Sequence, residues 1–420
     1  MRQPGIFRII LILTILLDMY VFQAVKLVCY SSSHKVKLIV YSCYWTLSAA
    51  TILLLLLLPY MNYDNWPRLV RTYLFATIVG LFFAKLIATT FFLIDDIRRL
   101  LQWACGKIFF RNTEAEAFSG GGISRSVFLS WLGLGAGASL FGTLVYGFGN
   151  KYRYQVHRLK LTFENLPAAF KGLKIVQLSD IHSGSFTDKQ AVLKGVEKVI
   201  KERPDLILFT GDLVNDRATE MYNYTDVFSR LQAPMGVYSI LGNHDYGDYY
   251  YGYDPVGKEA EEKAANLENV KAMHGQLGWR LLLDEHVVLQ RGEERIALIG
   301  VQNISGRRQF QTYGNMQKAY SGAEQYPFKI LMSHDPSHWD AQVRPEYPEV
   351  DLTLAGHTHG MQFGLELPGF RWSPVEYIYK HWAGLYEEGK QKLYVNRGFG
   401  FIGYPGRVGI LPEITVIELA

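Results

Sequence analysis

The sequence predicts a chain of two parts: an all-α membrane domain of four helices, followed by an α/β domain. The hydrophobic fraction of 49% and the mean hydropathy of +0.02 are high for a wholly soluble protein, and the apolar residues concentrate in the first third. Beyond that third, short apolar runs alternate with helix-like segments. A chain of 420 residues exceeds one ordinary domain. We therefore expect a membrane domain over residues 1–150 and a second domain over residues 151–420.

Four long apolar runs predict the membrane domain. Each is about as long as the ~20 residues that a membrane-spanning helix requires. The runs cover residues 6–25, 38–60, 69–94 and 127–146. Buried helices of a soluble core are an alternative, but such helices are usually shorter. A cleaved signal peptide is an alternative for the first run only, and no small-residue cleavage site follows that run.

The distribution of Lys and Arg predicts the orientation of these spans. Basic residues are enriched in two of the connections, which we expect to be cytoplasmic: Lys26, Lys35 and Lys37, and then Arg98, Arg99, Lys107, Arg111 and Arg125. Basic residues that follow the last span weaken this bias. The segment from Ser124 resembles a twin-arginine export signal, with Ser126 in place of the second arginine. Both features favour a second domain outside the cytoplasm.

The second domain repeats one pattern, in which an apolar strand-like run is followed by a polar cluster. The pattern occurs five times, in "LKIVQLSD", "PDLILFTGD", "MGVYSILGNHD", "FKILMSHDP" and "VDLTLAGHTHG". Helix-like segments at 187–202 and 218–231 separate the first three runs. We expect an open sheet whose strand ends gather the polar clusters into one crevice. Later runs at 279–290 and 295–302, with the terminal 413–420, suggest a second, more antiparallel layer.

The residues at these five strand ends are of the types that bind divalent metals. No cysteine follows Cys105, so any metal in the second domain must be held by nitrogen and oxygen. Two ions about 3.5 to 4 Å apart can clamp the attacking and leaving oxygens of a displacement at phosphorus. The candidates are Asp180, His182, Asp212, Asn215, Asn243, His244, His334, His357 and His359.

In this order the blocks "DIH", "GDLVN", "GNHD", "SHD" and "GHTH" resemble the signature of the calcineurin-like metallophosphoesterases. The closing segment "LYVNRGFGFIGYPGRVGILPEITVIEL" is similar to the membrane-anchored bacterial branch of that family. The resemblance covers residues 173–420 and leaves the membrane third uncovered. It implies a four-layer α/β/β/α sandwich with a dinuclear site at one edge, and a place in the bacterial inner membrane.

The resemblance also implies a role for each block. Two divalent ions (Mn, Zn or Fe) are expected: the first held by Asp180, His182, Asp212 and His359, and the second by Asp212, Asn243, His334 and His357. His244 would donate a proton to the leaving group. The chain departs from the commoner pattern at Asn215, where many members carry an aspartate that hydrogen-bonds this histidine. Asp216 or Asp245 would have to substitute for it, and we expect Asn215 and Asp245 beside the site.

Several other features have more than one interpretation. The tyrosine-rich stretch 245–255 is a lid that contacts substrate, a loop resting against lipid headgroups, or an ordinary solvated loop. Arg397 and Arg407 either contact phosphate oxygens or serve packing. The remaining histidines of the second domain, such as His274, His286, His338 and His381, are interpreted as structural, although His338 lies near the site in sequence.

These features predict a membrane-integrated enzyme that hydrolyses a phosphodiester or pyrophosphate bond by metal-bound hydroxide. His244 and His357 near the leaving group favour diesters over monoesters. Four spans suggest a lipid-linked phosphate ester and a lipid bilayer as partners. We expect no nucleic acid, because the net charge of +4 is small for this length. An acylated, nucleotide-linked sugar is an alternative substrate, but it requires a cytoplasmic site.

Two other classes of function are weighed against this one. The first is a non-catalytic scaffold or interaction protein of the same fold, but such proteins typically lose metal ligands and this set is complete. The second is a transporter or sensor coupled to the hydrolase. We expect no charged residue deep within a span, which disfavours it.

Overall fold

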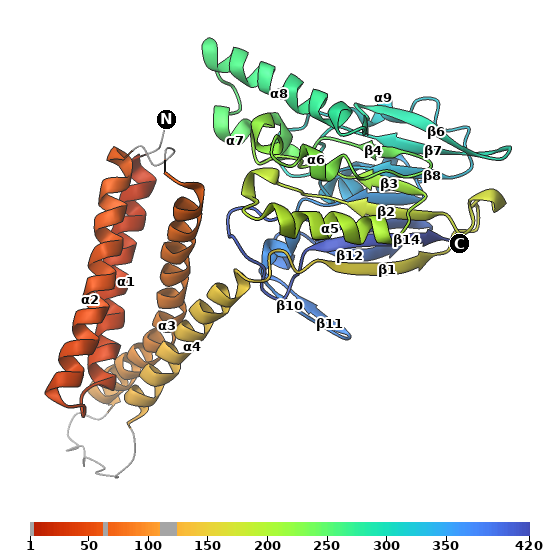
Figure 1. Cartoon of the computed structure of the whole chain (residues 1–420). Coiled ribbons are helices and arrows are strands. Elements are labelled where there is room, and N and C mark those ends of the chain that lie inside the picture. Colours follow the sequence, from red (N-terminus) through yellow and green to blue (C-terminus); the bar gives the residue numbers. More distant parts are fainter. Residues whose placement is uncertain (1–3, 62–65, 110–123) are drawn as a thin grey trace. The chain divides into compact units, whose positions relative to one another are not determined.

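The computed structural model describes residues 4–61, 66–109 and 124–420. The chain forms two compact units, Met1–Tyr146 and Gly147–Ala420 (Figure 1). The first unit consists of apolar helices and the second of mixed sheets with covering helices. Each unit is described by itself below.

Four long helices build the first unit. They are α1 (Pro4–Val28), α2 (His34–Leu57), α3 (Arg68–Phe109) and α4 (Arg125–Gly147). All four are long and apolar enough to cross a membrane, as the apolar runs predict. The third helix continues well past residue 94, where the apolar run ends, so Arg98, Arg99 and Lys107 are helical. Arg111 and most of the glycine-rich stretch 118–124 lie outside the described residues.

Asp18 and Lys85 lie well inside the candidate spans, so the expectation of spans free of deep charges is wrong. Asp18 of α1 is fully buried, and its carboxylate pairs with the ammonium of Lys85 in α3. The Lys85 Nζ also lies 3.4 Å from the Ser48 hydroxyl of α2, and the Tyr44 hydroxyl donates to the main-chain oxygen of Asp18 at 2.8 Å. This cluster joins three helices. The expected absence of deep charges was our argument against a transporter or sensor. The Asp18–Lys85 pair removes that argument.

Loss of one partner of this ion pair should destabilise the first unit. Asp18→Ala leaves the Lys85 charge buried and uncompensated, which costs about 3 kcal/mol. Asp18→Leu combined with Lys85→Leu removes both charges and should recover most of that loss. Thermal unfolding of the detergent-solubilised chain measures both effects. A double variant as unstable as Asp18→Ala would show that the pair does not provide the stabilisation.

Two six-stranded sheets form the framework of the second unit. The first sheet has the order β1 (Gln155–Leu161), β14 (Glu413–Leu419), β2 (Lys174–Leu178), β3 (Leu206–Phe209), β4 (Val237–Ser239) and β5 (Arg280–Leu281). The second has the order β12 (Gly384–Glu388), β13 (Gln391–Val395), β9 (Leu352–Ala355), β8 (Lys329–Met332), β7 (Glu294–Gly300) and β6 (Glu285–Arg291). A separate hairpin consists of β10 (Leu365–Leu367) and β11 (Phe370–Trp372).

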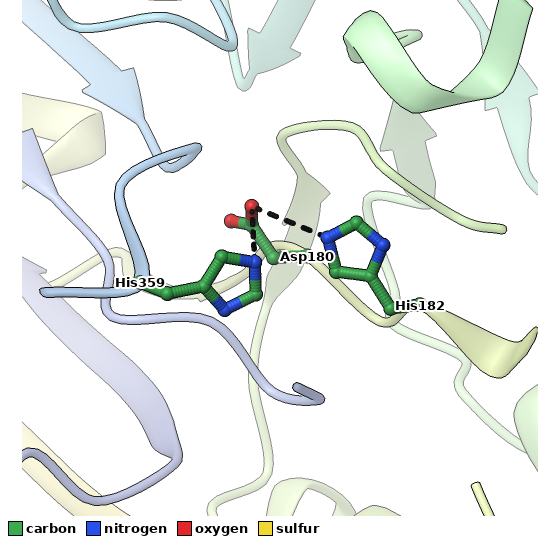
Figure 2. Close-up of side chains that lie close together, drawn as sticks. All are labelled: Asp180, His182 and His359. Carbon is green, nitrogen blue, oxygen red and sulfur yellow. Dashed lines mark ion pairs between the residues drawn. The ribbon is translucent and has the colours of Figure 1, made fainter. Parts of the chain in front are cut away.

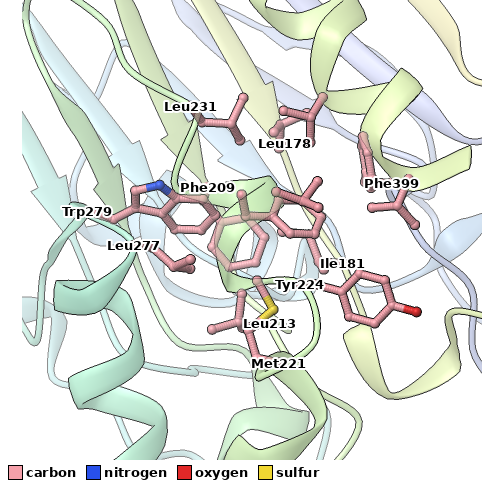
Figure 3. Packing of buried hydrophobic residues seen from close by; sticks show 14 of the residues in the cluster. Leu178, Ile181, Phe209, Leu213, Met221, Tyr224, Leu231, Leu277, Trp279 and Phe399 are labelled. Carbon is pink, nitrogen blue, oxygen red and sulfur yellow. The ribbon is translucent and has the colours of Figure 1, made fainter. Parts of the chain in front are cut away.

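The central strands are buried on both faces, as their unbroken apolar runs predict. In β3, Leu206 and Leu208 join the core between the sheets, whereas Ile207 and Phe209 point to the outer face. On the outer face of the first sheet, a cluster of buried apolar residues that we call the outer core includes Phe209, Trp279 and Tyr224 (Figure 3). Both sides of this sheet are therefore covered by apolar packing.

Helices cover the outer faces of the two sheets. The longest are α5 (Lys189–Lys201) and α8 (Lys258–Gln276), whose buried Val196 and Val270 belong to the outer core of the first sheet. The second sheet is covered by α9 (Met316–Tyr320) and the turn Trp339–Val343. Shorter helices are α6 (Thr225–Phe228), α7 (Asp248–Tyr251) and α10 (Arg344–Glu346). The predicted four-layer α/β/β/α sandwich is confirmed.

Four details of the fold differ from the expectation. The five motif-bearing strands do not share one sheet, because β8 and β9 lie in the second sheet. The terminal strand β14 lies in the first sheet, between β1 and β2. The second sheet is parallel through β7, β8, β9 and β13 and antiparallel only at its edges. Residues 218–231 form short helical turns instead of one helix.

Candidate metal centre

Strand ends from both sheets meet at one edge of the sandwich. The first sheet supplies the residues after β2, β3 and β4, and the second supplies those after β8 and β9. A parallel strand delivers its following loop to the same edge as its neighbours. Because the two sheets face each other, their loops converge even though the strands are not in one sheet. The gathered side chains are Asp180, His182, Asp212, Asn243, His244, His334, His357 and His359.

One group of ligand atoms surrounds the Asp180 carboxylate. The Nε2 atom of His359 lies 3.2 Å from Asp180 Oδ1, and the Nε2 atom of His182 lies 4.0 Å from the same oxygen. Figure 2 shows both rings turned toward this carboxylate. His182 Nε2 is also 3.4 Å from Asp212 Oδ2. The Asp212 carboxylate therefore belongs to this group as well.

A second group lies on the other side of Asp212. His334 Nε2 is 3.1 Å from Asp212 Oδ2, the same oxygen that faces His182. His357 Nδ1 is 2.7 Å from the amide oxygen of Asn243. One carboxylate is thus shared by imidazoles from two sheets, the arrangement expected of a residue that bridges two ions.

Buried nitrogens without hydrogen-bond partners show that these residues fit a metal. The Nε2 atoms of His182, His334 and His359 are all buried, and none forms a well-aligned hydrogen bond with a described residue, although those of His334 and His359 lie 3.1 and 3.2 Å from carboxylate oxygens. A buried polar atom left unpaired is costly, so such atoms in a cluster require a ligand. Neutral imidazole and carboxylate without thiolate suit Zn, Mn or Fe.

The backbone at this edge is strained. Asp180, His182, Asp212, His357 and His359 all adopt positive φ, between 46° and 70°, which side chains other than glycine rarely accept. Gly356 shows why the loop needs glycine at that point, because a Cβ there would collide with Ser179 and the Asp180 carboxylate. Strain concentrated at one cluster is typical of functional sites.

The electrostatics of the cluster favour cation binding. Burial alone would lower the pKa of His334, but the Asp212 carboxylate outweighs burial and raises that pKa to about 10. Burial lowers the pKa of His182 and of His359, which keeps both rings neutral. Burial would raise the pKa of Asp180, yet nearby His359 holds it below its usual range. A metal ion would replace the His334 proton as the positive charge beside Asp212.

His244 lies beside the two groups and is oriented by backbone. Its Nδ1 atom lies 2.7 Å from the main-chain oxygen of Asn215, so that nitrogen must carry the proton it donates. The Asn215 side chain instead bonds to Ser185. The Asp245 carboxylate is instead engaged by backbone, because it accepts from the N–H groups of residues 212, 213, 214 and 242. The carboxylate absent at position 215 is therefore replaced by a carbonyl oxygen.

Removal of the Asn215 side chain should have little effect on turnover. In Asn215→Ala the carbonyl that orients His244 remains, so hydrolysis of an activated diester should stay within about threefold of the unchanged chain. The comparison requires only the specific activity and the pH profile of both proteins. A loss of a hundredfold would mean that the side chain itself orients the proton donor.

Three aromatic residues also contact the site, and two of them, Tyr379 and Phe310, lie outside the stretches that the sequence singled out. Tyr249 of α7 packs against the His244 ring at 4.4 Å between centroids, and its hydroxyl accepts from the Asn243 amide at 3.0 Å. The Tyr379 hydroxyl lies 2.8 Å from His357 Nε2, and Phe310 packs edge-on to the same ring. Tyr249 belongs to the tyrosine-rich stretch, but aromatic residues in loops carry no pattern that would have marked Tyr379 or Phe310.

The remaining candidate residues stand outside the groups of ligand atoms, although Arg407 Nη2 lies 3.2 Å from His359 Nδ1. Arg397 is buried against Glu413 and Glu366, and Arg407 is wholly buried with its guanidinium on backbone carbonyls, so the structure favours packing for both. His274 is enclosed by Phe209 and Trp279. His338 bonds to Ser333 and Gln342 rather than to the candidate ligands.

Family comparisons agree with this geometry. Residues 173–361 match the family described as calcineurin-like phosphoesterase, and residues 1–150 match one described as probable calcineurin-like phosphoesterase, transmembrane domain. The four-layer sandwich and the metal-ligand cluster define a metallophosphoesterase. The chain belongs to the calcineurin-like phosphoesterases, and it is an integral membrane member of them. The predicted family is confirmed.

Several relatives resemble this chain over most of its length. A zebrafish transmembrane protein with metallophosphoesterase domain is 27% identical over 75% of this chain and 67% of its own. The metallophosphoesterase YkuE of Bacillus subtilis is 29% identical over 71% of this chain and 98% of its own. The phosphodiesterase YaeI of Escherichia coli is 28% identical over 68% of this chain and 94% of its own.

Proposed function

We propose that the protein is a membrane-integrated phosphoesterase with two metal ions, which hydrolyses a phosphodiester or pyrophosphate bond. The observation that carries the proposal is the shared Asp212 carboxylate, faced by His182 from one side and His334 from the other. The name of the Escherichia coli relative, a phosphodiesterase, supports the choice of a diester.

Each ion would have its own set of ligands. Asp180, His182 and His359 would hold the first together with Asp212, and Asn243, His334 and His357 would hold the second with the same bridge. The chemistry that divalent ions supply in such a site is neutralisation of the phosphoryl oxygens and activation of an attacking water. A chain with this set needs no covalent nucleophile.

His244 would complete the reaction as a proton donor. Its Nδ1–H group is engaged by the Asn215 carbonyl, which leaves Nε2 as the nitrogen that exchanges a proton with the substrate. Protonated at Nε2, the ring can donate to the alkoxide as it leaves phosphorus. Tyr249 packs against the ring and restricts its rotation. The complete ligand set supports catalysis over the scaffold alternative.

Metal removal should stop turnover, and loss of His244 should slow it strongly without loss of metal. Hydrolysis of an activated diester by the full chain should require Mn or Zn and stop with a chelator. His244→Ala should lower kcat by about a hundredfold or more while metal content is unchanged. His274→Ala is the matched control, because that histidine is buried outside the cluster.

The outcomes separate the possible roles. If His244→Ala loses metal, the residue is a ligand and the proton-donor role is wrong. If the unchanged chain binds metal but hydrolyses neither a diester nor a pyrophosphate, the scaffold alternative replaces the enzyme.

The substrate and the membrane side are further parts of the proposal. Four spans and a phosphoesterase site on one chain support a phosphate ester linked to lipid. The distribution of Lys and Arg supports a catalytic domain outside the cytoplasm, in a bacterial inner membrane. A compartment-sensitive reporter fused after Ala420 should be active only as an extracytoplasmic fusion, and cytoplasmic activity would reverse the assignment.

A further inference from the structure

The β10–β11 hairpin has its polar side turned inward and its apolar side turned outward. In its register Leu365 pairs with Trp372 and Leu367 with Phe370, so these four side chains share one face. Glu366 and Arg371 pair on the other face. A tight turn at Pro368 and Gly369, with Gly369 at φ +80°, closes the hairpin.

The polar face is held by the body of the domain. Glu366 forms an ion pair with buried Arg397, and the guanidinium of Arg371 lies 5.0 Å from the ring centre of Trp382. Trp382 belongs to a small core cluster with Val375, Tyr379 and Ile410. These contacts fix which side of the hairpin faces outward, so the exposure of the apolar side does not come from a loose segment.

The apolar face is open. The exposed fractions are 46% for Leu365, 53% for Leu367 and 54% for Phe370. Tyr377, which is 78% exposed, extends this face, because the Trp372 indole donates to its hydroxyl at 3.4 Å. Single exposed apolar residues are ordinary, but a contiguous face of them marks an interaction site. We call these five residues, Leu365, Leu367, Phe370, Trp372 and Tyr377, the hairpin face.

The hairpin is joined to the point where the chain leaves its last span. Gly147 ends α4, and its carbonyl accepts from the Arg407 amide at 3.0 Å. The next residue, Val408, donates to Gln362 at 2.8 Å and accepts from Gly364 at 2.9 Å. Leu365 follows directly as the first residue of β10. Two adjacent residues, Arg407 and Val408, therefore place the base of the hairpin beside Gly147, the first residue of the second unit.

We propose that the hairpin face docks into the interfacial layer of the lipid bilayer. Leucine and phenylalanine would enter the edge of the hydrocarbon, and Trp372 and Tyr377 would lie at headgroup level, where these two residue types are favoured. The bilayer is chosen over a second copy or a soluble partner because Gly147, through which this unit follows the last span in sequence, is hydrogen-bonded beside the base of the same hairpin.

Docking would also place the metal centre near lipid headgroups, a consequence that rests on the proposed function. The hairpin emerges from the "GHTHG" loop, and the Ser373 hydroxyl just after β11 donates to the Gly360 carbonyl at 2.8 Å. Tyr379, further along the same segment, contacts His357. A phosphate ester of a membrane lipid would thus meet the site at the bilayer surface.

Fluorescence quenching by lipids tests the docking without any assay of activity. Single cysteines are placed at Leu367 and Phe370 in a full chain with Cys29, Cys43 and Cys105 replaced, labelled with a polarity-sensitive dye and reconstituted into nanodiscs. Lipids brominated or spin-labelled high on the acyl chain should quench both positions. Glu293, exposed in the β6–β7 turn, is the control and should not be quenched. Quenching at Leu367 and Phe370 no stronger than at Glu293 would overturn the proposal.

A second measurement links docking to substrate. Leu367→Asp and Phe370→Asp should raise KM at least tenfold for a phosphodiester lipid in the same bilayer, and leave a water-soluble diester within about twofold. Val288→Asp, on the exposed side of β6, is the matched control for added charge. Equal KM values on the lipid substrate would overturn the link. Absence of hydrolysis of the soluble diester by the unchanged chain would reject the proposed function instead, while the quenching result would stand.

Discussion

The second unit is organised around one carboxylate, Asp212, which faces imidazoles from both sheets. His182 follows a strand of the first sheet and His334 follows a strand of the second, and both direct Nε2 at the same oxygen. This convergence is possible only because the two sheets pack face to face with their parallel strand ends at one edge. The cores on both sides of the first sheet hold β2 and β3 in place, so packing far from the site fixes the distances within it.

The loops around Asp212 hold these side chains close together, and their backbone is strained as a result. Five of the clustered residues adopt positive φ, and four backbone N–H groups from the adjacent loops bond to the Asp245 carboxylate. A strained loop persists only when its surroundings over-determine it. Arg407 contributes on the other side, where its buried guanidinium binds the carbonyls of Arg397 and Gly400. The buried Arg397 and Arg407 of the closing segment thus support the site.

Sequence reasoning anticipated which residues gather at the candidate site better than it anticipated the topology that gathers them. Each motif stands directly after an apolar run, which is a local signal, so Asp180, Asp212 and His357 were identifiable without a structure. Sheet membership depends on long-range pairing, and "FKILM" has no local feature that assigns it to the second sheet. A sequence also does not show contacts made by main-chain atoms. Asn215 was interpreted as the loss of a carboxylate that orients His244, whereas the main-chain carbonyl of Asn215 makes that contact. The Asp18–Lys85 pair was overlooked because two isolated charges hardly change the hydropathy of long apolar runs.

Metal stoichiometry tests the central claim most directly. The full chain, loaded with Zn or Mn and freed of excess metal, should contain two ions per chain by elemental analysis. Asp212→Ala removes the proposed bridging ligand and should lower the content to well under one ion. Asp254→Ala, an exposed aspartate in the tyrosine-rich stretch, should keep two. An Asp212→Ala chain that retains both ions, or an unchanged chain that binds only one, would contradict the shared-carboxylate account.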